Sequence, residues 1–382
     1  MTDGHKIEGE CSARFVAVRE AFTENFAAGR EVGASFAATV HGEVVVDLWG
    51  GHADAAHSRP WERDTIVNVF STTKAMTALC AHVLVDRGQL DLDVPVARYW
   101  PEFAQNGKHK MPVRWLLSHT AGLAAIREAL PVDAFYDWPR MTTALAAEKP
   151  WWEPGTQSGY HALTFGYLVG ELVRRISGKS PGRFFRDEVA QPLQLDFHIG
   201  LPLAEDGRVA DMVPPAAEET AAAGVSIEPD SLLAKVMGNP PLAPEQANTS
   251  AWRRAEIPAA NGHGNARSVA RAMAALACGG QLGGVRVLSE ATLLRAIEEQ
   301  TYGPDLVLGT RMRWANGFML SSAEMPLGPN PRTFGHGGWG GSLGFADLDA
   351  RVSWAYVMNK MSPGTTGDTR AFGLLMALYA AL

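Results

Sequence analysis

The chain has 382 residues, of which 46% are hydrophobic and 20% charged, and its formal net charge is −7 at pH 7. This length allows a large core and two lobes. The acidic balance, without a basic run, argues against binding to nucleic acid or to an anionic membrane surface. No apolar stretch approaches the roughly 20 residues that a membrane span needs.

Cysteine and histidine usage indicates a chain without disulfides or metal sites. Cys11, Cys80 and Cys278 lie far apart and match neither a disulfide framework nor a zinc pattern, which fits a reducing compartment. The eleven histidines show no H-x-H or H-E-x-x-H spacing, so we expect no metal and no cofactor. Residues 1–6 contain no apolar signal core, and we therefore expect a cytoplasmic protein.

The N-terminal part predicts a helix, a β-hairpin and a second helix. Apolar residues recur with helical period over residues 12–28, and two strand-like runs, Ala34–Val40 and Glu43–Trp49, flank a turn at His41-Gly42. Residues 65–70 are rich in β-branched and apolar side chains and predict an extended segment. The helix that follows from Ser71 ends at Gly88.

The remainder predicts helices first and strands afterwards. Helical patterns cover residues 114–118, 140–148, 161–177, 181–190, 266–278 and 289–300, and 201–260 reads as an irregular excursion. Strand patterns cover 311–320, 331–336, 342–349 and 351–359, before a last helix at 369–382. We therefore predict an α+β fold: an antiparallel sheet domain of residues 1–88 plus 262–382, flanked by helices, with a mostly helical domain, 89–261, inserted. A ligand would bind in the cleft between them.

Ser71-Thr72-Thr73-Lys74 is the most informative stretch. A serine and a lysine three residues apart share one face of a helix, so an amine is expected directly above Ser71. Serine is a weak nucleophile until a base takes its proton, and a desolvated lysine can be that base. The spacing alone is more often that of an N-capping serine with a solvated lysine, so the interpretation depends on further partners.

Tyr160 is the second candidate. It follows a turn at Pro154-Gly155 and lies in the loop before the helix at 161–177, where its phenol can point into the cleft. Near a lysine we expect its pKa to fall, so that it can shuttle the serine proton. Taken alone, a single tyrosine is more often a packing residue at the core or rim.

The third candidate is the glycine-rich segment 334–344, which contains His336-Gly337-Gly338-Trp339. Small residues at the edge of a predicted strand allow a substrate to approach the backbone, whose N–H groups can hold an oxyanion. A flexible glycine loop is the alternative. The G-x-G-x-x-G match at 335–340 has no following βαβ unit, and the G-x-S-x-G match around Ser342 has neither a following helix nor a later histidine, so we discount both.

With Ser71–Lys74, Tyr160 and His336-Gly337-Gly338 in that order, the chain resembles the serine β-lactamase and penicillin-binding-protein superfamily. It is most similar to class C β-lactamases and the related family VIII carboxylesterases. The resemblance implies that Ser71 is the acylated nucleophile and that Lys74 lowers its pKa. It implies that Tyr160 is the general base and that the backbone N–H groups of Ser71 and Trp339 form the oxyanion hole.

Departures from the family pattern indicate the substrate class. The position of the asparagine in the Tyr-x-Asn motif of class C β-lactamases is Ala162, and His336 replaces the lysine of the Lys-Thr-Gly motif. An uncharged ester therefore fits better than a carboxylated lactam or a D-Ala-D-Ala peptide. We expect His336, Gly337, Gly338 and Trp152 to bind substrate; packing in the core is an equally good account of Trp151 and Trp152.

We therefore expect a cytoplasmic serine carboxylesterase that hydrolyses small acyl esters through an acyl-Ser71 intermediate, with weak β-lactamase activity as an additional possibility. A β-lactamase, a D-amino-acid peptidase or an acyltransferase on the same fold is one alternative, and a non-catalytic scaffold is the other. The expected partner is a small-molecule ester, with no nucleic acid and no membrane. Acyl-chain length, the alcohol and the oligomeric state stay open.

Overall fold

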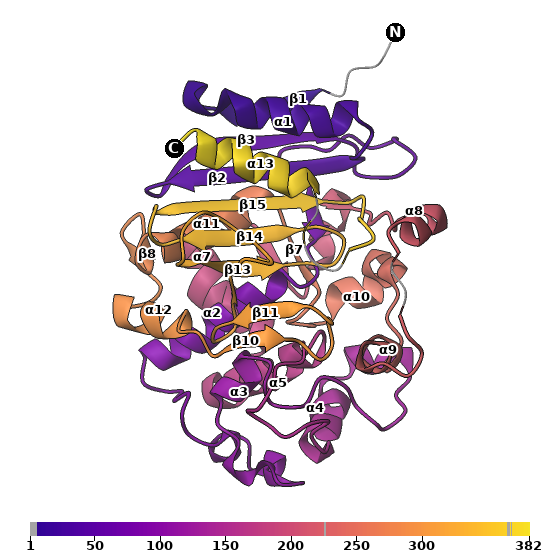
Figure 1. Cartoon of the computed structure of the whole chain (residues 1–382), viewed down its shortest axis with the longest axis vertical. Helices are drawn as coiled ribbons and strands as arrows, with labels where there is room; N and C mark the ends of the chain where they lie inside the picture. The colour runs from indigo at the N-terminus through magenta and orange to yellow at the C-terminus, as the bar shows by residue number, and fades with distance from the viewer. Residues whose placement is uncertain (1–5, 225–226, 365–366, 368) are drawn as a thin grey trace.

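The computed structural model describes residues 6–224, 227–364, 367 and 369–382 (Figure 1). Its main feature is a nine-stranded antiparallel sheet in the order β1-β3-β2-β15-β14-β13-β12-β11-β10. The strands are β1 (Ile7–Cys11), β2 (Gly33–Val40), β3 (Glu43–Gly51), β10 (Thr301–Pro304), β11 (Arg311–Trp314), β12 (Met319–Leu320), β13 (Thr333–Gly337), β14 (Leu343–Asp347) and β15 (Val352–Met358). The α+β fold with a sheet from both chain ends is thereby confirmed.

The predicted hairpin at the N-terminal end has a local cause. His41 and Gly42 both adopt positive φ, 51° and 85°, as a two-residue turn between right-twisted strands requires. β2 then pairs with β15, so the first and last thirds of the chain meet at the centre of the sheet. Because both faces are covered, the β15 side chains are buried throughout the strand.

Helices cover both faces of this sheet. α1 (Val16–Ala27) and α13 (Thr369–Ala380) pack side by side on one face, and α11 (Ala266–Ala277) lies against β2, β14 and β15 on the other (Figure 1). The apolar residues of α11 recur on one side of the helix, which explains its burial between sheet and lobe.

The other helices, most of them from the middle of the chain, lie below and beside the sheet in Figure 1, where α3, α4, α5 and α9 are below it and α8 is level with β15. These helices are α2 (Thr73–Asp86), α3 (Arg114–Leu117), α4 (Trp138–Ala147), α5 (Thr164–Ser177), α6 (Pro181–Phe185), α7 (Gln191–Leu193), α8 (Ala217–Ala222), α9 (Leu232–Gly238), α10 (Ser250–Arg254) and α12 (Glu290–Ala296). Helix α2 is buried on almost every side, and it contacts α5, α6 and α12. Helix α12 stops at Ala296, which is shorter than the predicted 289–300.

A second, four-stranded sheet places the start of α2. Its order is β5-β7-β4-β6, from β5 (Phe197–Ile199), β7 (Gly262–Gly264), β4 (Ile66–Asn68) and β6 (Val209–Ala210). Strand β4 is the extended segment predicted before Ser71. This sheet joins strands from both sides of the predicted boundaries near residues 88 and 261, and those boundaries stay a prediction. The remaining pair, β8 (Gln281–Leu282) and β9 (Val285–Arg286), is a short hairpin.

Two parts of the chain differ from the sequence interpretation. The excursion at 201–260 contains three α-helices, α8 to α10, where an irregular segment was expected. The edge strands β1 and β10 were not predicted from the sequence. Each has at most five residues, and so short a run gives only a weak strand pattern. Within the described residues, none of the helices has the length and apolar character to cross a bilayer. Residues 1–5, part of the basis for the predicted location, lie outside the described residues.

Candidate active site

Ser71 lies at the corner between β4 and α2, as predicted. Phe70, immediately before it, adopts a positive φ of 42° and forms an isolated bridge with Asn261. A non-glycine residue in this region is strained, and such strain persists where packing fixes the backbone. The Phe70 ring packs against Trp339 at 5.3 Å between centroids, which joins the corner to the glycine-rich segment.

Lys74 lies one helical turn above Ser71 and is fully buried. Its Nζ is 2.9 Å from Ser71 Oγ, 2.6 Å from the carbonyl oxygen of Ala162 and 2.9 Å from that of Ala259. Burial lowers the pKa of Lys74 well below the usual lysine range. A neutral amine has two N–H groups and one lone pair. With the two carbonyls accepting the N–H groups, the lone pair is left for the Ser71 hydroxyl proton.

Tyr160 meets the same serine. Its side chain lines the same cavity as Ser71, and the Lys74 Nζ lies 4.8 Å from the centroid of its ring. The ring stacks on Trp314 with an interplanar angle of 3°. However, burial raises the pKa of Tyr160, and the nearby Ser71 hydroxyl offsets only part of that shift. The expectation that its pKa falls is therefore wrong, because desolvation outweighs the neighbouring amine.

Asp305, which the sequence did not indicate as a site residue, holds Tyr160 in position through hydrogen bonds. One oxygen of its carboxylate accepts the backbone N–H of Tyr160 at 2.9 Å, and the other accepts the Trp314 indole N–H at 3.2 Å. Both the backbone and the stacking partner of the phenol are thus held by one buried side chain. Nothing in the local sequence marks Asp305, which lies in the turn between β10 and β11.

His336 is buried beside Tyr160, with ring centroids 5.9 Å apart. Its Nδ1 lies 2.7 Å from the Gly337 carbonyl, which assigns the proton to that nitrogen. Burial lowers the pKa of His336 to about 3, so the imidazole is neutral at physiological pH. His336 therefore presents no positive charge in place of the lysine that the family pattern has at this position.

Two backbone N–H groups converge beside the serine. Those of Ser71 and Trp339 donate no hydrogen bond to any group in the described ranges. Gly338 brings the two segments together, because a Cβ on it would lie 2.2 Å from the Val69 carbonyl oxygen and 3.2 Å from Ser71 N. The Ser342 hydroxyl donates to the Val69 carbonyl at 2.7 Å, and β14 follows it, so this serine holds the corner together.

A narrow cavity of about 60 Å³ opens directly onto Ser71. Its lining is apolar apart from the Ser71 and Tyr160 hydroxyls and the Trp339 indole N–H. The lining residues are Phe70, Ser71, Tyr160, Ala162, Leu163, Leu233, Met237, Leu242, Ala260, Leu308 and Trp339. The cavity residues Leu233, Met237 and Leu242 belong to the segment 201–260, which was predicted to be irregular.

The four expected substrate-binding residues lie elsewhere: His336, Gly337, Gly338 and Trp152 are not among the residues that line this cavity. The indole N–H of Trp152 donates to the Gln157 carbonyl at 2.9 Å, and its ring meets His161 edge-on. In this structure the His336 ring packs against Tyr160 of the cavity lining, and the Trp152 ring packs against His161. Their direct contact with substrate stays a prediction.

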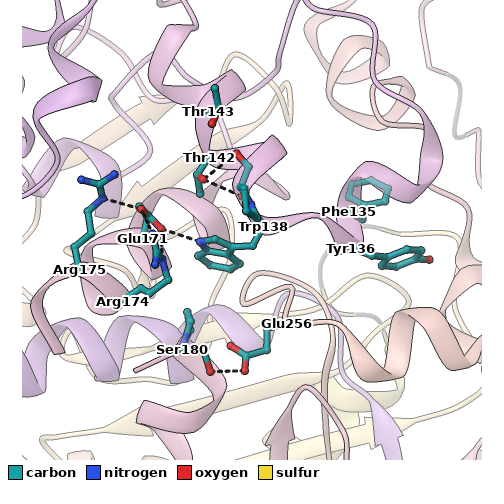
Figure 2. A pocket seen from close by; sticks show the side chains of 12 residues that line it. Phe135, Tyr136, Trp138, Thr142, Thr143, Glu171, Arg174, Arg175, Ser180 and Glu256 are labelled. Carbon is teal, nitrogen blue, oxygen red and sulfur yellow. Dashed lines mark hydrogen bonds and ion pairs between the residues drawn. The ribbon is translucent and has the colours of Figure 1, made fainter. Parts of the chain in front are cut away.

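A larger pocket, of about 540 Å³, lies between α4 and α5 (Figure 2). Its buried carboxylate, Glu171, is paired with Arg174 and Arg175 and accepts the Trp138 indole N–H at 2.7 Å. Across the pocket, Ser180 donates to Glu256 at 2.6 Å. These polar groups are hydrogen-bonded or ion-paired with one another, and none of the predicted catalytic residues lines the pocket. Within the described residues no cluster of three or more His, Cys, Asp or Glu side chains could hold a metal ion.

Comparisons with known proteins identify the family of this chain. The family model described as Beta-lactamase matches residues 18–377. The chain is 38% identical to "Esterase/beta-lactamase LipL" of Mycobacterium tuberculosis, over 97% of this chain and 87% of the relative.

Two solved structures share the whole fold. One is described as a family VIII carboxylesterase (47% identity, TM-score 0.92, covering 99% of this chain and 100% of the other). The second is a penicillin-binding protein homologue from Caulobacter crescentus (43% identity, TM-score 0.91, with the same coverage). The match to the family model spans nearly the entire chain, and the chain belongs to the Beta-lactamase family.

Proposed function

We propose that the protein is a serine carboxylesterase that hydrolyses small, uncharged acyl esters through an acyl-Ser71 intermediate. Family membership and the esterase names of its relatives support serine hydrolase chemistry. The observation that carries the proposal is the buried Lys74 amine. It lies 2.9 Å from Ser71 Oγ, and two carbonyls occupy its other hydrogen-bonding positions.

In the acylation step, the Ser71 oxygen attacks the ester carbonyl while its proton passes to the neutral Lys74 amine. Tyr160, whose phenol stays protonated, hydrogen-bonds to Ser71 and carries the proton on to the leaving alcohol. The carbonyl oxygen becomes an oxyanion that accepts the N–H groups of Ser71 and Trp339. Each such donor is worth about 3–4 kcal/mol of transition-state stabilisation.

In the deacylation step, a water molecule takes the place of the alcohol, and the proton transfers of acylation run in the opposite direction. Lys74 and Tyr160 accept its proton as its oxygen attacks the acyl carbonyl, and Ser71 recovers its proton when the acid leaves. The resemblance assigned the base to Tyr160. The opposite pKa shifts of the two residues support Lys74 as the base and Tyr160 as the relay.

An uncharged ester is the substrate class that this cavity accommodates best. Its lining carries no charged side chain in the described part of the chain. Ala162, at the asparagine position of the lactamase motif, contributes a methyl group and its carbonyl oxygen is already bonded to Lys74. A substrate carboxylate would therefore be desolvated without a partner, which costs free energy.

Kinetics with p-nitrophenyl acetate and butyrate test the proposal. We expect Ser71→Ala to lose activity and to lose labelling by a fluorophosphonate probe. Tyr160→Phe keeps the stacking on Trp314 but lacks the relay, and we expect kcat to fall by roughly 10²–10⁴-fold. A Ser71→Ala protein that retains wild-type turnover would disprove the nucleophile assignment.

β-Lactam hydrolysis is the second candidate, because the printed name of LipL combines both activities. The apolar lining and neutral His336 favour esters. The two activities are distinguished by measuring kcat/KM for nitrocefin and for p-nitrophenyl butyrate with the same enzyme preparation. A higher kcat/KM for nitrocefin than for p-nitrophenyl butyrate would favour β-lactam hydrolysis over ester hydrolysis.

A further inference from the structure

We propose that helix α9 and the turn after it form the acyl-binding wall and set the length of acyl chain that the enzyme accepts. This inference rests on the proposed esterase function. Leu233 and Met237 of α9, with Leu242 beyond its end, face the cavity that opens onto Ser71. Among the residues that line this cavity, none has a charged side chain, and Ser71 and Tyr160 carry the hydroxyl groups.

The spacing of these residues explains why α9 presents an apolar edge. Leu233 and Met237 are four positions apart and therefore lie on one face of the helix. Both are half-buried, because one side of each contacts the core and the other is exposed to the cavity. Val236, on a neighbouring face, is buried and anchors the helix to the core. The Ser231 hydroxyl caps the N-terminus by accepting the Ala234 N–H.

Asn239 attaches the end of α9 to the helical lobe. Its side-chain oxygen accepts the Leu130 N–H at 2.8 Å, and its amide nitrogen donates to the carbonyls of Ile126 and Glu128 at 2.7 Å each. All three partners belong to the loop between α3 and α4. The wall is therefore fixed in position, and the size of its side chains decides how much space remains.

The space that remains is small. A cavity of about 60 Å³ is less than half the roughly 150 Å³ of an apolar cavity that binds benzene. An acetyl or propionyl group fits this volume, whereas a longer chain meets the ends of Met237 and Leu233. Each methylene that an apolar pocket accepts or rejects changes kcat/KM by roughly 10–200-fold. The native enzyme should accordingly prefer short acyl chains.

The acyl group, rather than the alcohol, is the occupant that this geometry favours. The acyl group is bonded to Ser71 in the intermediate, and Ser71 is one of the residues that line the cavity. The alcohol has to leave past the Tyr160 hydroxyl and exchange with water. An apolar lining would hinder that exchange with water, but it would hold an acyl chain throughout both steps.

The test compares p-nitrophenyl acetate with p-nitrophenyl octanoate. We expect Met237→Ala and Leu233→Ala each to raise the octanoate-to-acetate ratio of kcat/KM about tenfold. Leu232→Ala is the matched control, because Leu232 is an apolar, partly buried residue of the same helix that does not line the cavity. If a helix variant fails to fold, Leu242→Ala, outside the helix, provides the same comparison.

Two outcomes would overturn the inference while leaving the esterase function intact. One is an unchanged ratio in active Met237→Ala and Leu233→Ala enzymes. The other is a change that appears only when the alcohol is lengthened, in a series from methyl to hexyl acetate. Failure of the proposed function itself looks different: the wild type hydrolyses no ester of the panel, or Ser71→Ala hydrolyses them equally well.

Discussion

At the scale of single residues, the ionisation of the site should appear in its pH profile. Lys74 acts as a base only when neutral, so kcat/KM should fall as pH drops below its depressed pKa and reach a plateau above it. Burial holds the pKa of His336 at about 3, so this imidazole stays neutral across the working range. We therefore expect His336→Asn to lower activity without moving the acid limb by more than about half a pH unit.

The profile of kcat/KM for p-nitrophenyl acetate between about pH 5 and pH 9 measures this. His109 is an exposed histidine remote from the site, and His109→Asn is the matched control. Loss of the acid limb in His336→Asn would assign that limb to the imidazole and contradict the role of Lys74.

Sequence reasoning at this scale identified residue types but not their environments. The helical spacing of Ser71 and Lys74 placed the amine beside the hydroxyl, and the structure brings Tyr160 into the cavity that Ser71 lines. The direction of the Tyr160 pKa shift depends on burial by residues distant in sequence, such as Trp314. The hydrogen bond between Asp305 and the Tyr160 backbone likewise joins residues that are distant in sequence and forms only in the folded chain. Neither is encoded in a local pattern.

At the scale of elements, the junction of β13 and α2 has little tolerance for added atoms. A Cβ at Gly338 would lie 2.2 Å from both the Val69 carbonyl and Ser342 Oγ, which are parts of the packed corner. A Cβ at Gly337 would lie 2.9 Å from the end of the Leu343 side chain and 3.7 Å, an ordinary contact distance, from the Ser342 carbonyl oxygen. We expect Gly338→Ala to lower kcat at least about 100-fold by displacing the oxyanion donors.

Gly337→Ala, one residue earlier, is the control and should lose less than about tenfold, because a leucine side chain can rotate away. Steady-state kinetics and thermal unfolding of both variants provide the measurement. Equal losses of kcat in the two variants would contradict the proposed position of the oxyanion hole.

Elements with strong local signals could be predicted, and those that depend on tertiary packing could not. The hairpin at His41-Gly42, the start of α2 and the helix α11 follow from turn chemistry and periodicity. Helix α9 has seven residues, and it is stabilised by contacts of Val236 and Asn239 with distant parts of the chain. Its role as the cavity wall was therefore hidden in a sequence that looked irregular.

At the scale of the whole molecule, one buried ion pair connects the two chain ends to the active site. Arg370, at the start of α13, donates to Glu31, which follows α1, at 3.0 Å. The same guanidinium donates to the carbonyl of Gly340 at 3.1 Å, next to Trp339. The pattern of strands predicted a sheet made from both ends of the chain, but a contact 339 residues apart in sequence had no signal.

Removal of this arginine should therefore affect both stability and catalysis. The Arg370 and Glu31 side chains are 5% and 0% exposed, so Arg370→Met leaves a buried carboxylate without its cation. We expect the free energy of unfolding to fall by about 3–5 kcal/mol, and kcat to fall because the Gly340 carbonyl loses one of its two donors and keeps the Ser362 N–H at 2.8 Å. Urea denaturation of Arg370→Met and of the double variant Glu31→Gln/Arg370→Met measures the coupling. Since the second substitution, Glu31→Gln, replaces the carboxylate by a neutral amide, the double variant should recover at least about 1 kcal/mol, whereas strictly additive losses would mean that the charge of Glu31 does not depend on Arg370.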